Sequence, residues 1–131
     1  MPFKAKAVQF EISNVNHGLQ TASGLLKLVG EQLVLEFQLK DAFFEVFKSD
    51  VEEITIPLRE LQSVELKKGW FSSKIILEAR SLRVFDEIPG TEGGECKLKI
   101  KRKDRKDAEN LVSKIRLTMS EMKLKDLDDE H

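Results

Sequence analysis

The sequence lacks the disulfide pairs and metal-ligand motifs that stabilise very small domains. It has 131 residues and one cysteine, so no intramolecular disulfide can form. Cys96 lies in an alternating run, which favours a small buried hydrophobe over a reactive thiol. The two histidines, His17 and His131, have no neighbouring cysteine or carboxylate pair with metal-ligand spacing. A chain of this length buries roughly two-thirds of its unfolded surface, so one hydrophobic core is sufficient. We therefore predict a single domain over 1–131 with no cofactor and no metal.

Long apolar runs and an excess of one charge are also missing. No segment approaches the roughly 18 apolar residues that a membrane span requires, and the first twelve residues have no signal-peptide core. The absence of a disulfide framework is typical of a reducing compartment, so we expect a cytoplasmic protein. The net charge is −1. The chain as a whole is therefore not attracted to nucleic acid, and we expect no nucleic-acid partner.

Catalytic motifs are absent as well. The sequence has no G-x-S-x-G, no phosphate-cradling G-x-x-x-x-G-K and no glycine-rich fingerprint after a strand. No cysteine–histidine pairing is suggested by the spacing, and scattered carboxylates in an acid-rich chain are not evidence of an acid–base pair. We expect that the protein is not an enzyme.

What the sequence does contain is alternation. In 33–39, Leu33, Leu35, Phe37 and Leu39 share one face, and in 95–101 the apolar residues alternate with glutamate and lysine. Both patterns are typical of strands with one wet face. Segment 41–50 has two interpretations, an extension of the preceding strand or a loop. Less regular alternation predicts five further strands, at 7–12, 24–29, 52–57, 63–67 and 74–80.

The pattern changes near residue 104. Apolar residues then recur at steps of three and four, which predicts an amphipathic helix over 104–123 with Asp104 at its N-cap. The polar tail, 124–131, is expected to fray. The predicted core-facing stripe consists of Ala108, Leu111, Val112, Ile115, Met119 and Met122.

Seven antiparallel strands followed by one helix predict a mainly β fold, in which the helix caps a partly open barrel. This order resembles the pleckstrin-homology-like superfold, and the resemblance covers about 7–122. The segment in which the resemblance is strongest is ITIPLRELQSVELKKGW (54–70), which is similar to bacterial pleckstrin-homology-like and GRAM-like domains. The resemblance implies an interaction module and supplies no catalytic residue.

Phosphoinositide binders of that superfold carry a basic motif in their first hairpin. The corresponding segment here, 13–22, contains neither lysine nor arginine. The two other loops of the usual ligand mouth, 40–50 and 81–95, hold more carboxylates than cations. This mouth would repel an inositol phosphate, so the sequence argues against that ligand. A basic peptide, or no ligand, fits the mouth better.

Two aromatic segments could anchor a partner. The first is KKGWFSSK (67–74). Alternation counted back from strand 74–80 predicts that Phe71 is buried. Trp70 then either folds over the end of the helix as a lid or points outward as an anchor for a partner. The second segment contains Phe43, Phe44 and Phe47. Packing of at least two of these rings in the core is the favoured interpretation, with an exposed ring as the alternative.

The densest run of positive charge has two interpretations. It is either a solvated sheet edge, with Glu78 pairing opposite its lysines, or a patch for an anionic membrane. No aromatic residue interleaves with it, so a base-stacking platform is missing. The run comprises Lys97, Lys99, Lys101, Arg102, Lys103, Arg105 and Lys106.

The leading functional hypothesis is a non-catalytic module that binds a protein or peptide, including a second copy of itself. Trp70 or the Phe43–Phe47 segment would supply the anchor, and a free strand edge could add a peptide strand. The alternative is a peripheral module for anionic membranes that uses the basic run 97–106. A small apolar ligand inside the barrel is a third possibility, but large residues expected to face inward favour a filled interior.

Overall fold

The computed structural model describes residues 7–44, 46–47 and 49–129. It contains seven strands and a long C-terminal helix, which confirms the predicted mainly β class. The strands are β1 (Val8–Val15), β2 (Gln20–Val29), β3 (Gln32–Asp41), β4 (Glu52–Pro57), β5 (Leu61–Lys68), β6 (Ser72–Ala79) and β7 (Glu95–Lys101). Two short 3-10 turns, η1 (Leu58–Glu60) and η2 (Arg102–Asp104), precede β5 and the helix α1 (Arg105–Asp129).

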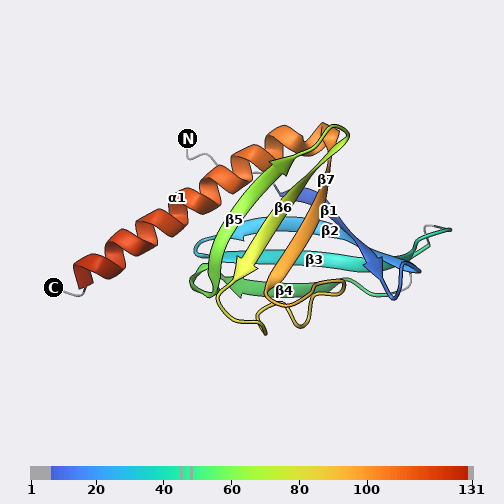
Figure 1. Ribbon diagram of the computed structural model, residues 1–131, viewed down its shortest axis with the longest axis horizontal. Helices are drawn as coiled ribbons and strands as arrows, with labels where there is room; N and C mark the ends of the chain where they lie inside the picture. The colour runs from blue at the N-terminus through green and yellow to red at the C-terminus, as the bar shows by residue number, and fades with distance from the viewer. Residues whose placement is uncertain (1–6, 45, 48, 130–131) are drawn as a thin grey trace.

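All seven strands form one antiparallel sheet in the order β4-β3-β2-β1-β7-β6-β5. The sheet does not close, because β4 and β5 are its two edges. In Figure 1, β5, β6 and β7 cross steeply over β1 to β4, and α1 lies along one side. The two parts join where β1 meets β7 through a single register pair, Glu11 and Lys99. This architecture is compatible with a pleckstrin-homology-like fold.

Alternation decides which side chains fill the interior. In β7, Cys96, Leu98 and Ile100 are fully buried, whereas the lysines between them are exposed. Leu35 and Phe37 of β3 are buried as predicted. Burial of Cys96 raises the pKa of its thiol to about 12, so the residue behaves as the small hydrophobe that the pattern indicated. The inward faces of the two crossing parts together make one core.

Helix α1 covers the open side of this core with the predicted stripe. Five of its six residues are buried, and Met119 is partly buried against the core. The helix continues six residues beyond the predicted end, to Asp129, while 130–131 lie outside the described residues. A contact near this end explains part of the difference. The guanidinium of Arg59 in η1 donates to both carboxylate oxygens of Asp126 at 3.2 Å.

A glycine is required in the middle of β2. Gly24 lies opposite Phe37 of β3. A Cβ at position 24 would lie 1.7 Å from the carbonyl oxygen of Glu36 and 2.7 Å from the Cα of Phe37. No side chain fits in that space, so only glycine lets the two strands approach so closely here.

The aromatic segment after β3 differs from its prediction. Strand β3 ends at Asp41, and the side chains of Phe43, Phe44 and Phe47 are 74%, 79% and 58% exposed. The favoured interpretation, core packing of at least two rings, is therefore wrong. Asp41 gives the reason, because its carboxylate accepts hydrogen bonds from the N–H groups of Phe43 and Phe44 at 2.8 and 2.9 Å. Such a side-chain acceptor turns the chain out of the strand.

Candidate functional site

The hairpin between β5 and β6 presents two exposed aromatic rings at its tip. The last register pair is Lys68 with Ser73, and the Gly69 N–H donates to the carbonyl oxygen of Ser72 at 2.9 Å. Trp70 and Phe71 occupy the turn itself, with 81% and 80% of their surfaces exposed. We call this segment, 69–72, the hairpin tip.

The burial predicted for Phe71 is wrong for a geometric reason. Alternation holds only inside a strand, and β6 begins at Ser72. Ser73 is buried, as counting back from the strand predicted. Two residues earlier the chain is already in the turn, so the side chain of Phe71 does not follow the inward face.

Helix α1 holds the hairpin tip in place. Arg105, the first residue of the helix, donates from Nε to Ser73 Oγ at 3.0 Å and from a terminal nitrogen to the Gly69 carbonyl oxygen at 2.5 Å. On the next turn, Glu109 pairs with Lys68 at 2.7 Å. The hydrogen bond from Lys68, and then its charge, lower the pKa of the Glu109 carboxyl. The tip is therefore fixed relative to the helix although its rings face solvent.

The contacts at the tip bring together two segments of high positive charge. Ser72 lies opposite Lys101, so the end of β7 and the start of α1 lie beside the hairpin. Segments 67–74 and 101–109 together hold eight of the 22 basic residues but only three of the 23 acidic ones. Arg102, Lys103 and Lys106 are exposed there. Five of the seven residues of the predicted basic run, those in 101–106, thus lie in the segment beside the hairpin.

The rest of that run is distributed differently. Arg105 has a structural role under the tip, and Lys97 lies farther along β7, where it pairs with Glu95 at 3.4 Å.

The predicted pairing of Glu78 opposite the lysines is wrong. Glu78 lies opposite Glu95, two residues before Lys97, the nearest lysine of β7. The run is therefore not neutralised across the hairpin in the way that the solvated-edge interpretation assumed.

Instead, three lysines lie opposite one another across the outer face of the sheet. Lys67 of β5 pairs in register with Lys74 of β6, which pairs in turn with Lys99 of β7. All three are exposed. Like charges directly opposite on neighbouring strands are destabilising, so this arrangement has an electrostatic cost. We call these three residues the lysine row.

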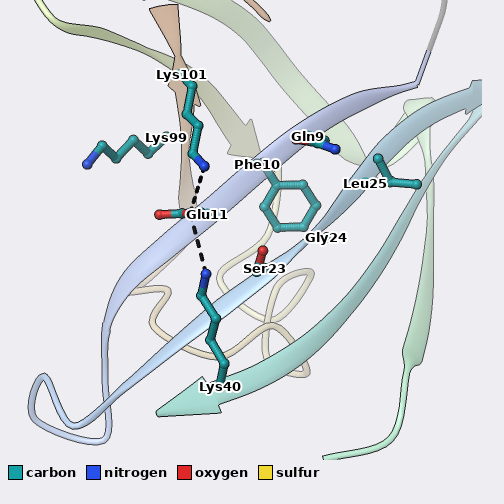
Figure 2. Close-up of a pocket in the computed structure, with 9 residues that line it drawn as sticks. All are labelled: Gln9, Phe10, Glu11, Ser23, Gly24, Leu25, Lys40, Lys99 and Lys101. Carbon is teal, nitrogen blue, oxygen red and sulfur yellow. Dashed lines mark ion pairs between the residues drawn. The ribbon is translucent and has the colours of Figure 1, made fainter. Parts of the chain in front are cut away.

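Beside the lysine row, a pocket of about 260 Å³ opens on the outer face where β1, β2 and β7 meet. Figure 2 shows Lys40 and Lys101 directed at Glu11 from opposite sides, with the hydroxyl of Ser23 nearby and Lys99 extending away. The Glu11 carboxylate lies 3.7 Å from the Lys40 ammonium and 3.9 Å from that of Lys101. We call this the outer pocket.

The second aromatic segment lies apart from the hairpin tip, in the loop between β3 and β4. Phe47 forms an isolated bridge with Lys40, and Ala42 donates to the Leu19 carbonyl oxygen at 3.0 Å. Leu19 and Val46 are exposed beside the three phenylalanines. The structure therefore does not join the two predicted anchors into one surface.

Sequence reasoning missed the lysine row and the outer pocket. Lys67 and Lys74 carried a weak signal, since both lie in the segment KKGWFSSK (67–74) that contains Trp70. Nothing in the linear pattern could place Lys40 near Lys101, because β3 and β7 are not neighbours in the sheet. The strand order β3-β2-β1-β7 places Glu11 of β1 between them, and both side chains reach its carboxylate.

Comparison with known proteins adds no further identification: no family model matches the chain, and no similar protein was found among curated proteins or solved structures. Within the described ranges, no helix combines the length and the apolar character needed to cross a bilayer. No group of three or more metal-ligating side chains gathers in that same part of the chain.

Proposed function

We propose that the protein is a non-catalytic module that binds the surface of anionic membranes through its hairpin tip. The observation that carries the proposal is the exposure of Trp70 and Phe71 at a turn that Arg105 holds, in a hairpin that is rich in basic residues, as is the adjoining segment 101–109. Indole rings favour the boundary between head groups and acyl chains. Basic side chains near an anionic leaflet each contribute about 1 kcal/mol of attraction.

The surroundings of the two rings favour a lipid surface over a protein. Cores of protein interfaces are depleted in charged residues, and their aromatic anchors fill desolvated pockets. Here Lys67, Lys74 and Lys101 lie on the strands beside the turn, and those that a tight protein contact covered would have to be desolvated. At a bilayer the rings can enter the acyl boundary while the lysines remain among the head groups.

The pleckstrin-homology-like and GRAM-like assignment is part of this proposal. The order of strands and the position of α1 support it, as does the pattern in 54–70. A membrane contact at the tip differs from the ligand mouth of that superfold, whose first hairpin is uncharged here. The proposed surface is therefore specific to the residues of this chain.

A protein partner or self-association is a second candidate function, located at another surface. It is favoured by the exposure of Phe43, Phe44 and Phe47 together with Leu19 and Val46. Sedimentation velocity over a range of concentrations tests self-association. A shift to dimers at high concentration that is lost in Phe43→Ala/Phe44→Ala would support it. A protein that stays monomeric at every concentration would rule out self-association.

The membrane proposal is tested by co-sedimentation with vesicles of phosphatidylcholine alone and of phosphatidylcholine mixed with phosphatidylserine. We expect binding only to the anionic vesicles, weakened as salt is raised because surface charges are screened. Trp70→Ala/Phe71→Ala should reduce binding about 30-fold, from the loss of about 2 kcal/mol of apolar burial.

The matched control is Phe43→Ala/Phe44→Ala, which removes two equally exposed rings from the other segment. It should bind vesicles like the unmodified protein. Equal binding by the Trp70/Phe71 variant, or equal pelleting with and without anionic lipid, would contradict the proposal.

A further inference from the structure

Beyond a diffuse electrostatic contact, we infer that the outer pocket is a binding site for one phosphate monoester group. The lipid form of this inference rests on the proposed function, and Lys101 is the residue that the pocket shares with the basic surroundings of the hairpin tip. The pocket lies on the outer face of the sheet, whereas Trp70 and Phe71 form the turn. Of the residues that line the pocket, only Lys40, near the end of β3, belongs to a loop segment of the usual ligand mouth, 40–50.

Charge balance is the first reason. Three lysines, Lys40, Lys99 and Lys101, line the pocket together with a single carboxylate, that of Glu11. The ammonium groups of Lys40 and Lys101 are directed at Glu11, whereas the side chain of Lys99 extends away from it (Figure 2). Glu11 can neutralise only one of them. Within the described part of the chain, Lys99 has no ion pair of its own, and it lies opposite Lys74. A phosphate monoester carries about −1.5 to −2 charges at neutral pH, which matches the excess.

Unfilled hydrogen-bonding capacity is the second reason. The distances of 3.7 and 3.9 Å from Glu11 to Lys40 and Lys101 exceed the range of about 2.7–2.9 Å for charge-assisted hydrogen bonds. Each ammonium carries three donors. The side chain of Lys40 is only 18% exposed, so solvent has limited access to it. An oxyanion seated between these lysines would accept the donors that Glu11 does not reach.

The shape of the pocket fits a small oxyanion. Its volume of about 260 Å³ suits one tetrahedral group with part of its ester. The Ser23 hydroxyl and the Gln9 amide supply neutral donors at the wall. Lys101, opposite Ser72, connects the pocket to the base of the hairpin tip. A lipid head group could therefore enter the pocket while the tip contacts the same leaflet, and a free phosphate monoester could enter without lipid.

The first test uses soluble ligands. Inorganic phosphate and glycerol phosphate are titrated into isotopically labelled protein at constant ionic strength, with sodium chloride as the balancing salt. We expect saturating shifts at the amides of Ser23, Gly24 and Lys99. Lys99→Met should weaken binding about tenfold, because it removes one charged donor. Lys40→Met should do the same, and the two variants compare the half-buried lysine with the exposed one.

Lys125→Met is the matched control, since it removes the same charge from an exposed position near the far end of α1. It should bind phosphate like the unmodified protein. Circular dichroism confirms that the variants are folded, and Lys99→Met retains the test if Lys40→Met does not fold. Shifts that never saturate, or equal affinities in Lys99→Met, Lys125→Met and the unmodified protein, would overturn the inference.

The second test separates the two sources of the phosphate group. Vesicles with phosphatidic acid, a phosphate monoester, are compared with phosphatidylserine vesicles of matched surface charge. Stronger binding to phosphatidic acid that Lys99→Met removes identifies a lipid head group. Equal binding to both, with the soluble titration positive, identifies a free phosphate monoester. If no vesicle binds at all, the proposed function fails, while the soluble titration still decides on the pocket.

Discussion

The guanidinium of Arg105 donates to the carbonyl oxygen of Gly69 at 2.5 Å and so ties the first turn of α1 to the hairpin tip. The same side chain is the hydrogen-bond partner of the fully buried Ser73. One residue of the predicted basic run thus positions the turn that carries Trp70 and Phe71. Its loss should affect both stability and the geometry of the tip.

Replacing Arg105 with alanine is expected to lower the free energy of unfolding by about 1–3 kcal/mol, because the buried Ser73 hydroxyl loses its partner. Urea denaturation measures the change. Arg116→Ala is the control, since Arg116 is exposed on the same helix. Equal destabilisation by the two substitutions would show that the contacts of Arg105 have no special role.

Gly24→Ala is expected to destabilise the fold by roughly 3 kcal/mol or more, because the new Cβ would overlap the backbone of Glu36 and force β2 away from β3. Gly30→Ala tests a different cost. Gly30 has a φ of 60° and no atom within 4 Å of a built Cβ, so alanine there should cost only about 1–2 kcal/mol. Thermal and urea unfolding of the two variants compare these costs. A smaller effect at Gly24 than at Gly30 would contradict the close approach.

The Cys96 thiol should be unreactive in the folded protein. Its pKa is raised to about 12 by burial, so the thiolate is scarce below pH 10. A chromogenic disulfide reagent should label Cys96 only after unfolding in guanidinium. Rapid labelling of the native protein at pH 8 would contradict the burial of this residue.

The same pKa shift predicts how stability depends on pH. The unfolded thiol loses its proton near the ordinary value of 9.0, whereas the folded thiol keeps it. The unfolded state therefore binds fewer protons above pH 9, and stability falls as the pH rises toward 12. We expect a loss of about 1.4 kcal/mol at pH 10 relative to neutral pH. Cys96→Ala should lack this contribution, and parallel pH profiles for the two proteins would contradict it.

The end of α1 should depend on its contact with η1. Asp126→Asn removes the charge that Arg59 binds, and should increase hydrogen exchange over 123–129 without a large change in global stability. The pair is exposed, so its contribution is at most about 1 kcal/mol. Mass spectrometry of exchanged peptides measures the effect. Asp128→Asn, on the same turn, is the control and should leave exchange unchanged.

The sequence predicted the fold where the side-chain period is regular. Leu98 and Ile100 were placed on the inward face of a strand, and Leu111 and Ile115 on the inward stripe of a helix, because burial of one face enforces these periods. Phe71 was misplaced because alternation does not show where a strand gives way to a turn. Phe43 and Phe44 were misplaced because the Asp41 carboxylate, rather than hydrophobicity, decides the direction of the chain there.

The candidate site was predictable only in its parts. Trp70 and the basic run were recognised individually, but their proximity depends on the pairing of β6 with β7 and on the contact of Arg105 with Gly69. The outer pocket depends on the strand order, which places Glu11 of β1 within reach of Lys40 on β3 and Lys101 on β7. Such relationships between non-neighbouring strands are set by the register and curvature of the sheet, which a single sequence does not specify.

The uneven distribution of charge between the hairpin end and the remainder of the molecule has a consequence before any contact is made. Acidic side chains outnumber basic ones outside segments 67–74 and 101–109, so the protein has a permanent electric dipole despite its small net charge. An anionic surface exerts a torque on such a dipole within about a Debye length of 8 Å at physiological salt. Molecules that arrive in random orientations would be rotated so that the indole of Trp70 leads the approach, which raises the fraction of collisions that are productive.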